Sequence, residues 1–172
     1  MTSSGPNPYS LRVNPTATLL LALQSDLLPA PGQPVAARSD DSELRLNISV
    51  VFTSEELTRA ALGHAAALAE SLDAKITLLA VQSVPFPLQL QQSPVSVRWN
   101  EERALDIAAD SPVETAVQVY LCRDRLQTLR SVLESGSIVV IGCRRRPWPT
   151  FEMRLGRKLR HLGYEVVLTE GE

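Results

Sequence analysis

The sequence predicts an α/β fold, a single doubly wound domain whose parallel sheet carries helices on both faces. From residue 44 onward, short β-branched segments alternate with longer segments in which apolar residues recur at helical spacing. One short segment, SIVVIGC at 137–143, is apolar on both faces, as is typical of a strand inside a parallel sheet. Five such strands alternating with four helices predict right-handed crossovers between parallel neighbours.

The first strand and the first helix are predicted on either side of a short polar turn. Residues 44–52 form the strand, and Thr53 or Ser54 caps a helix whose first turn carries two glutamates, as the helix dipole favours. The residues at helical spacing that should face the sheet are Leu57, Ala61, His64, Ala65, Leu68 and Leu72. This position makes His64 a core or boundary histidine rather than a ligand.

The middle of the chain continues the alternation. A turn and the second strand occupy residues 72–82, and a proline-rich loop follows at 84–97. Residues 99–110 form a short helix, and the alternation of residues 114–122 predicts a strand at one edge of the sheet. Asp124 should cap the next helix.

The C-terminal part supplies the last helix and two strands. Gly136 is expected to end the third helix, directly before the fourth strand. Thr150 is the expected N-cap of a helix that runs to Leu162. The residues of this helix that should face the sheet are Leu155, Leu159 and Leu162. Gly163 then ends the helix, and residues 164–169 form the fifth strand.

The chain divides into an extension and a domain. Residues 1–43 are rich in Pro, Ser, Gly and Asp, which predicts a mobile N-terminal extension, and residues 44–172 form the domain. Leucines at helical spacing within 16–28 would give a short helix that docks on the domain or a partner, or else a transiently helical tail. This apolar run is too short for a bilayer and lacks a basic leader, so cytoplasmic residence without a membrane is expected.

Positive charge is concentrated behind the fourth strand. Net charge is −2, yet seven Lys or Arg lie between residues 144 and 160 against the single acid Glu152. The run Arg144, Arg145 and Arg146 comes at the edge of the sheet where open α/β folds bind ligands. A small anion is therefore expected there, whereas an extended nucleic-acid or membrane surface is disfavoured.

Three segments of the domain carry a resemblance to a known family. They are VVFTSEEL, AALGHAAALAESLDAKITLLAV, and the closing IVVIGCRRR with RLGRKLRHLGYEVVLT. In order and spacing they resemble the universal stress protein family. The resemblance implies an adenine-nucleotide-hydrolase-like sheet in the order 3-2-1-4-5, a homodimer through the fifth strand, and a non-enzymatic protein with ATP or another nucleotide as ligand.

The glycine motif of that family is altered in this chain. ATP-binding members carry Gly-x-x-Gly, a spacer of about nine residues, and Gly followed by Ser or Thr. Gly142 matches the first glycine, Arg145 stands at the second, and Gly156 lies one residue from the third, with Arg157 in place of the hydroxyl. An Asp expected after strand one is replaced by Thr53 or displaced by a deletion. The candidate cofactor-binding residues are thus Thr53, Ser54, Gly142, Arg144, Arg145, Gly156 and Arg157.

These substitutions leave two interpretations and an unassigned cofactor. In one, the guanidinium groups of Arg144, Arg145 and Arg157 bind phosphate or carboxylate, and Trp148 stacks on a base or an arginine. In the other, the site has degenerated, because the two prolines of the loop lack amide donors and the arginines pair with acids such as Glu55 and Glu56. Neither interpretation includes catalysis, although low-level nucleotide hydrolysis stays open.

Two other functions are open. One is a protein interaction module without a small ligand, using the N-terminal leucines and the loop at 84–97. The other is weak nucleic-acid binding by a basic helix face, for which a solvated surface is the simpler explanation. That face comprises Arg154, Arg157, Lys158 and His161. The chain has no P-loop, nucleophile elbow or dinucleotide fingerprint, and Cys122 and Cys143 are expected as structural thiols.

Overall fold

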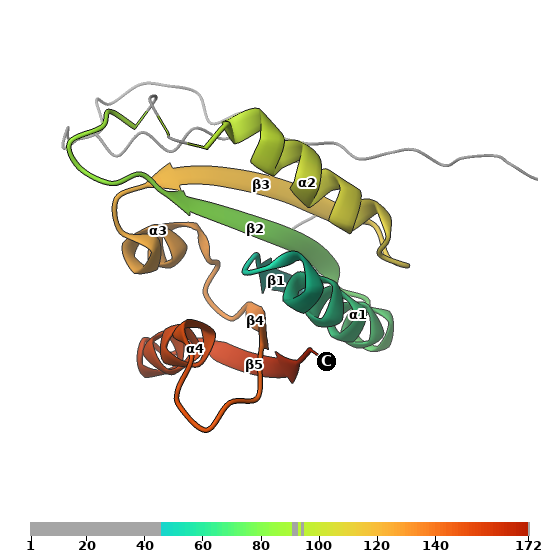
Figure 1. Cartoon of the computed structure of the whole chain (residues 1–172). Coiled ribbons are helices and arrows are strands. Elements are labelled where there is room, and N and C mark those ends of the chain that lie inside the picture. The colour runs from blue at the N-terminus through green and yellow to red at the C-terminus, as the bar shows by residue number, and fades with distance from the viewer. Residues whose placement is uncertain (1–45, 91–92, 94, 172) are drawn as a thin grey trace, which may run out of the picture.

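The structure, a computed structural model, describes residues 46–90, 93 and 95–171 (Figure 1). Along these residues the elements are β1 (Asn47–Val51), α1 (Glu55–Leu72), β2 (Lys75–Ser83), α2 (Val97–Ala109), β3 (Thr115–Cys122), α3 (Arg125–Val132), β4 (Ile138–Cys143), α4 (Phe151–His161) and β5 (Glu165–Glu170). All strands are parallel, in the order β3-β2-β1-β4-β5. The predicted fold class and strand order are confirmed, while the expected N-terminal extension lies outside the described residues.

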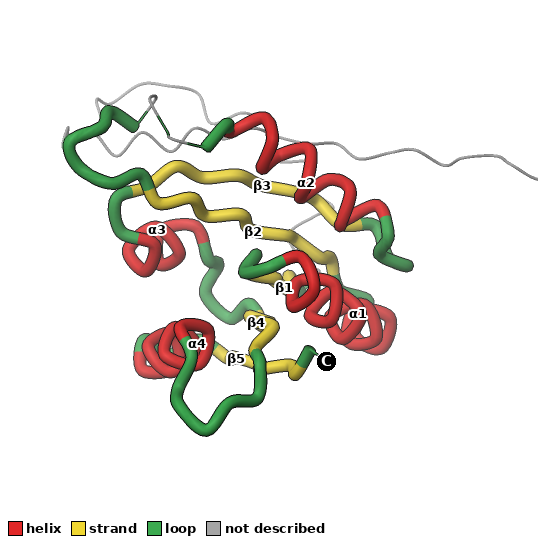
Figure 2. The backbone as a smooth tube through the Cα atoms, in the orientation of Figure 1, coloured by secondary structure: helices red, strands yellow, loops and turns green. Residues whose placement is uncertain are grey.

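Different pairs of helices cover the two faces of the sheet (Figure 2). α1 and α2 pack on one face, where Leu62, Ile107 and the strand residue Val50 belong to one buried cluster. α3 and α4 cover the other face, to which Leu129 and Leu159 contribute. The central strands β1 and β4 are buried on both sides, and for β4 the continuous apolar sequence predicts this burial.

The C-terminal edge of the sheet is stepped. β1 ends at Val51, opposite Leu79 of β2 and Ile141 of β4. β2 runs on to Ser83, where it pairs with Cys122 of β3 and no longer with β1. At the C-terminal edge of the sheet β1 therefore ends before β2 does, which forms a step. The turn from β1 into α1 begins at this step.

The inward face of α1 differs from the prediction. His64 is exposed, and so is Leu72, so their placement toward the sheet is wrong. The buried stripe includes Leu62, Ala66 and Ala69 instead. Small alanine side chains allow close packing of helix on sheet, and an imidazole left in water has no desolvation cost. The predicted and the observed inward faces of α1 are both largely apolar. Helical periodicity in the sequence therefore does not decide which of them packs on the sheet.

Two helix ends also differ from the prediction. α3 ends at Val132, and Gly136, with a φ of 84°, lies in the turn that follows rather than at the helix end. α4 ends at His161, so that Leu162 is 41% exposed and does not face the sheet. Gly163, with a φ of 91°, turns the chain into β5. In both turns a left-handed backbone conformation requires glycine.

The remaining expectations concern the edge strand, the thiols and the membrane. β3 lies at an edge of the sheet, as predicted, with Ala116 exposed. Cys122 and Cys143 are free and buried, and burial raises the pKa of both thiols, which suits a structural role. In the part of the chain that the structure describes, no helix is long and apolar enough to cross a bilayer.

Candidate functional site

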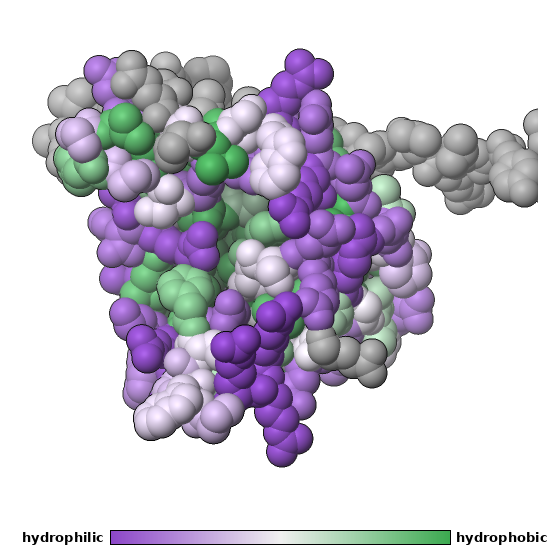
Figure 3. Space-filling model, viewed as in Figure 1, coloured by the Kyte–Doolittle hydropathy of each residue, from purple (hydrophilic) through white to green (hydrophobic). Residues whose placement is uncertain are grey.

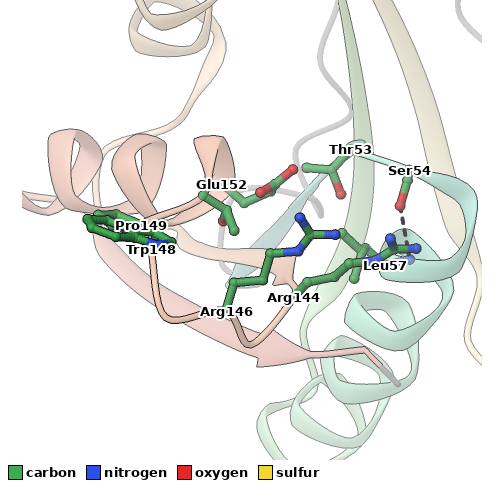
Figure 4. Close-up of a pocket in the computed structure, with 9 residues that line it drawn as sticks. Thr53, Ser54, Leu57, Arg144, Arg146, Trp148, Pro149 and Glu152 are labelled. Atoms are coloured by element: carbon green, nitrogen blue, oxygen red, sulfur yellow. Dashed lines mark hydrogen bonds between the residues drawn. The ribbon is translucent and has the colours of Figure 1, made fainter.

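A pocket opens at the step in the sheet, beyond the C-terminal ends of β1 and β4 (Figure 4). Its volume is about 490 Å³. The lining residues come from the β1–α1 turn, the β4–α4 loop and the first turn of α4; they are Thr53, Ser54, Leu57, Arg144, Arg146, Trp148, Pro149, Thr150 and Glu152. The chain leaves β1 toward β2 on one side and returns as β4 on the other, so the pocket lies at the topological switch point of the sheet.

Hydroxyl groups fix the β1–α1 wall of the pocket. The amide of Thr53 donates to Thr58 Oγ1 at 3.2 Å, and that hydroxyl donates to the carbonyl of Ser54 at 2.6 Å. Ser54 Oγ in turn accepts from the amide of Leu57 and caps α1. Thr53 Oγ1 is buried and has no hydrogen-bond partner among the described residues. The wall therefore presents one unsatisfied hydroxyl beside a fixed helix N-terminus.

We expect Thr58→Val to loosen this wall. The side chain of Thr58 is fully buried, and valine keeps its shape while leaving the amide of Thr53 unpaired. The free energy of unfolding should fall by about 1–3 kcal/mol in urea titrations. Thr58→Ser retains the hydroxyl and is the matched control for the hydrogen bonds. Equal stability of the valine variant and the wild type would contradict this account of the turn.

Gly142 has a packing role under α1. A Cβ at this position would lie 2.0 Å from the carbonyl oxygen of Leu57, so only glycine lets the first turn of α1 contact β4 this closely. Gly142 is not among the residues that line the pocket. The sequence places Gly142 at the first glycine of a phosphate loop. In the structure it instead allows β4 to pack closely on Leu57, which lines the pocket.

The three consecutive arginines point to different partners. Arg144 lines the pocket, half-exposed, and forms an ion pair with Glu56 of α1. Arg145 is 87% exposed and lies 4.0 Å from the carboxylate of Glu170, outside the pocket. Arg146 lines the pocket, and no carboxylate of the described residues lies within ion-pair distance of it. Figure 4 shows its guanidinium extending toward the region between Glu152 and Thr53.

One interpretation of the sequence predicts that Glu55 and Glu56 pair with the arginine run, and in the structure only Glu56 does so among the described residues. The Arg144–Glu56 ion pair agrees with the interpretation in which the arginines neutralise neighbouring acids. Glu55 contacts Arg59 and Arg103 instead, and the hydrogen bonds from these two arginines lower the pKa of its carboxyl group. Only Arg146 of the run remains with its charge directed at the pocket.

Two further candidates from the sequence lie away from the pocket. Gly156 is buried in α4 against β5, where a Cβ would lie 3.0 Å from a methyl group of Leu168. Arg157 is exposed on α4 and does not line the pocket. The structure thus brings together Thr53, Ser54 and Arg144 from the predicted site. It leaves Gly142, Arg145, Gly156 and Arg157 outside.

The site residues that the sequence did not single out come from the start of α4. Thr150 caps this helix by accepting from the amide of Met153 at 3.4 Å, and Glu152 occupies its first turn. Both also line the pocket, as does Arg146. The N-cap of α4 was predicted, and the parallel topology places it at the same edge as the N-cap of α1. The shared edge of the two N-caps is the feature from which Thr150 and Glu152 could have been predicted as site residues.

The chemistry of the lining residues suits binding of a small anion. Two helix N-termini and the Arg146 guanidinium converge on a pocket with apolar walls from Leu57, Trp148 and Pro149. Hydrophilic residues gather over the β4–α4 loop at the bottom of the view in Figure 3. Within the described ranges, no cluster of His, Cys, Asp and Glu could hold a metal ion.

Comparison with known proteins leaves the family open. No protein-family model matches the chain, and no curated protein matches it at a significant level.

Proposed function

We propose that the protein is a non-enzymatic, universal-stress-like domain that binds a small phosphate-bearing anion, such as a nucleotide, in the pocket at the switch point. The observation that carries the proposal is the Arg146 guanidinium, which lines this pocket with no acid of the described chain in ion-pair contact. Arg146 is exposed at the mouth of the pocket, and a guanidinium without a counterion is a preferred partner for phosphate, because it binds two phosphate oxygens at once.

The two helices add to the attraction. Ser54 and Thr150 are the N-caps of α1 and α4, and both line the pocket. Each helix N-terminus carries about half an elementary positive charge and free first-turn amides. An anion held between them gains this field in addition to the ion pair with Arg146. The hydroxyls of both caps already accept helix amides, which supports a binding role rather than a nucleophilic one.

Arg146→Ala should remove most of the anion affinity. In isothermal titration calorimetry with inorganic phosphate, AMP and ATP, we expect the Kd of bound ligands to rise about tenfold or more, as loss of a charged hydrogen bond implies. Arg130→Ala, on the exposed last turn of α3, removes the same charge far from the pocket and should leave the Kd unchanged. Failure of every anion to bind the wild type, or equal losses in the two variants, would refute the proposal.

A protein interaction module is the second candidate, and the β2–α2 loop favours it. Phe86 in this loop is 82% exposed and Trp99 in the first turn of α2 is 51% exposed, and Figure 3 shows hydrophobic residues interspersed with hydrophilic ones at the upper left. The guanidinium of Arg123 donates to the carbonyls of Val84 and Pro85 and stacks over Phe86 at 4.3 Å. The loop is thus an exposed apolar surface held by internal bonds. Absence of any anion effect on the wild type would favour this function.

A further inference from the structure

The charges of the pocket limit how much negative charge a ligand can bring. Arg146 is the cation directed at the pocket, since Arg144 pairs with Glu56 and Arg145 lies beside Glu170. The two helix N-termini add about half a positive charge each. Together they supply about two positive charges, from which the carboxylate of Glu152 in the same pocket subtracts one, so the pocket favours a ligand with a single phosphate group. A triphosphate carries more negative charge than the pocket can compensate.

The β4–α4 loop also lacks the donors that an extended phosphate chain needs. Pro147 and Pro149 have no amide hydrogen, so neither can donate to a phosphate oxygen. The side chain of Arg145, which could otherwise reach a second phosphate, is 87% exposed and directed toward β5. Since Arg144 is held by Glu56, the position next to Arg146 is the one among the described residues that combines an unpaired guanidinium with the helix N-termini lining the pocket.

Glu152 introduces a second requirement. Its carboxylate lines the same pocket as Arg146, and no cation of the described residues forms an ion pair with it. An ionised carboxylate only accepts hydrogen bonds, and it repels a bare phosphate ion. A ligand that places hydroxyl donors beside its phosphate would satisfy Glu152 and remove this penalty. The apolar walls from Leu57 and Pro149 suit the carbon skeleton of such a ligand.

We infer that the ligand is a phosphomonoester of a hydroxyl-rich carbon skeleton, with its phosphate on Arg146 and a hydroxyl on Glu152. Sugar phosphates and nucleoside monophosphates share this chemistry. The inference rests on the proposed anion site and assigns Glu152 as its specificity-determining residue. Trp148, which is 81% exposed at the rim, separates the two sources, because a base can stack on it and a sugar phosphate lacks one.

Calorimetric titrations of the full chain test the inference with four probes, namely inorganic phosphate, ribose 5-phosphate, AMP and ATP without magnesium. Ribose 5-phosphate and AMP should bind about tenfold more tightly than phosphate, and ATP should bind more weakly than AMP. AMP binding that exceeds ribose 5-phosphate binding, and falls to it in Trp148→Ala, identifies a nucleoside monophosphate. Equal binding of the two identifies a sugar phosphate.

Glu152→Gln supplies the decisive comparison. Glutamine keeps the shape but removes the repulsion, so phosphate and ATP should bind more tightly and the preference for ribose 5-phosphate over phosphate should shrink toward one. Glu114→Gln, an exposed acid before β3 at the opposite edge, is the control and should change neither affinity nor preference. Wild-type protein that prefers phosphate or ATP, or a preference unchanged in Glu152→Gln, overturns the inference while the anion site stands. Absence of binding by all four probes overturns the anion site itself.

Discussion

Gly142→Ala is expected to lower the free energy of unfolding by about 3 kcal/mol or more, at the upper end of overpacking effects. The new Cβ would lie 2.0 Å from the carbonyl oxygen and 2.6 Å from the carbonyl carbon of Leu57, both backbone atoms. Unlike a side-chain end, backbone in the first turn of α1 can only move with the helix. The helix N-terminus must shift away from β4, and the cap at Ser54 that lines the pocket shifts with it.

A second glycine provides the control for this substitution. Gly63 lies within α1, is exposed, and has open space where a Cβ would be. Gly63→Ala should raise the stability by about 0.5–1 kcal/mol, because alanine restricts the unfolded chain and favours the helix. Urea titrations followed by circular dichroism measure both effects. Similar stabilities for the two variants would contradict the close contact between α1 and β4.

Leu159→Ala should have the other large effect, a loss of about 2–5 kcal/mol. Leu159 is fully buried between α4 and the sheet, in the cluster that also holds Leu155 and Val166. Removing its branched end leaves a cavity that the β-sheet beneath cannot fill. The urea midpoint should fall accordingly while the far-ultraviolet spectrum of the folded state is retained.

Leu162→Ala is the matched comparison in the same helix. Leu162 is at the C-cap of α4 and 41% exposed, so its truncation should cost less than about 1 kcal/mol. The sequence periodicity treats the two leucines alike, and only the structure separates them. Equal losses from Leu159→Ala and Leu162→Ala would show that α4 extends further than described and buries both.

The elements of the fold could be predicted because each one obeys a local rule. Asp124 caps α3 through its carboxylate, and the uninterrupted apolar segment 138–141 is buried on both faces. The strand order, by contrast, came from family resemblance, since periodicity does not specify which strands are neighbours. The inward stripe of α1 was displaced because Leu62 and Ala66 compete with His64 for the sheet, and packing decides between them.

The candidate site could be located from the sequence but not resolved in detail. A basic run after a central strand predicts a site at the edge of the sheet where the pocket lies, because the C-terminal ends of parallel strands share that edge. Consecutive residues in a loop have no fixed periodicity, so the sequence could not tell that Arg146 rather than Arg145 faces the pocket. In the sequence, Glu152 stands out only as the single acid between residues 144 and 160. Whether it lines the pocket depends on where α4 begins.

The early end of β1 has a consequence for hydrogen bonding inside the sheet. Beyond Leu79, β2 has no partner strand on the side of β1, although it continues to Ser83 beside β3. Backbone donors and acceptors of Val81 and Ser83 on that side must therefore find other partners, such as water or a bound molecule. The early end of β1 therefore leaves the backbone at the end of β2 without a strand partner on one side, and Ser83 at this end is exposed. This unpaired stretch is short and belongs to an inner strand, so β3 and β5 stay the full-length edges of the sheet.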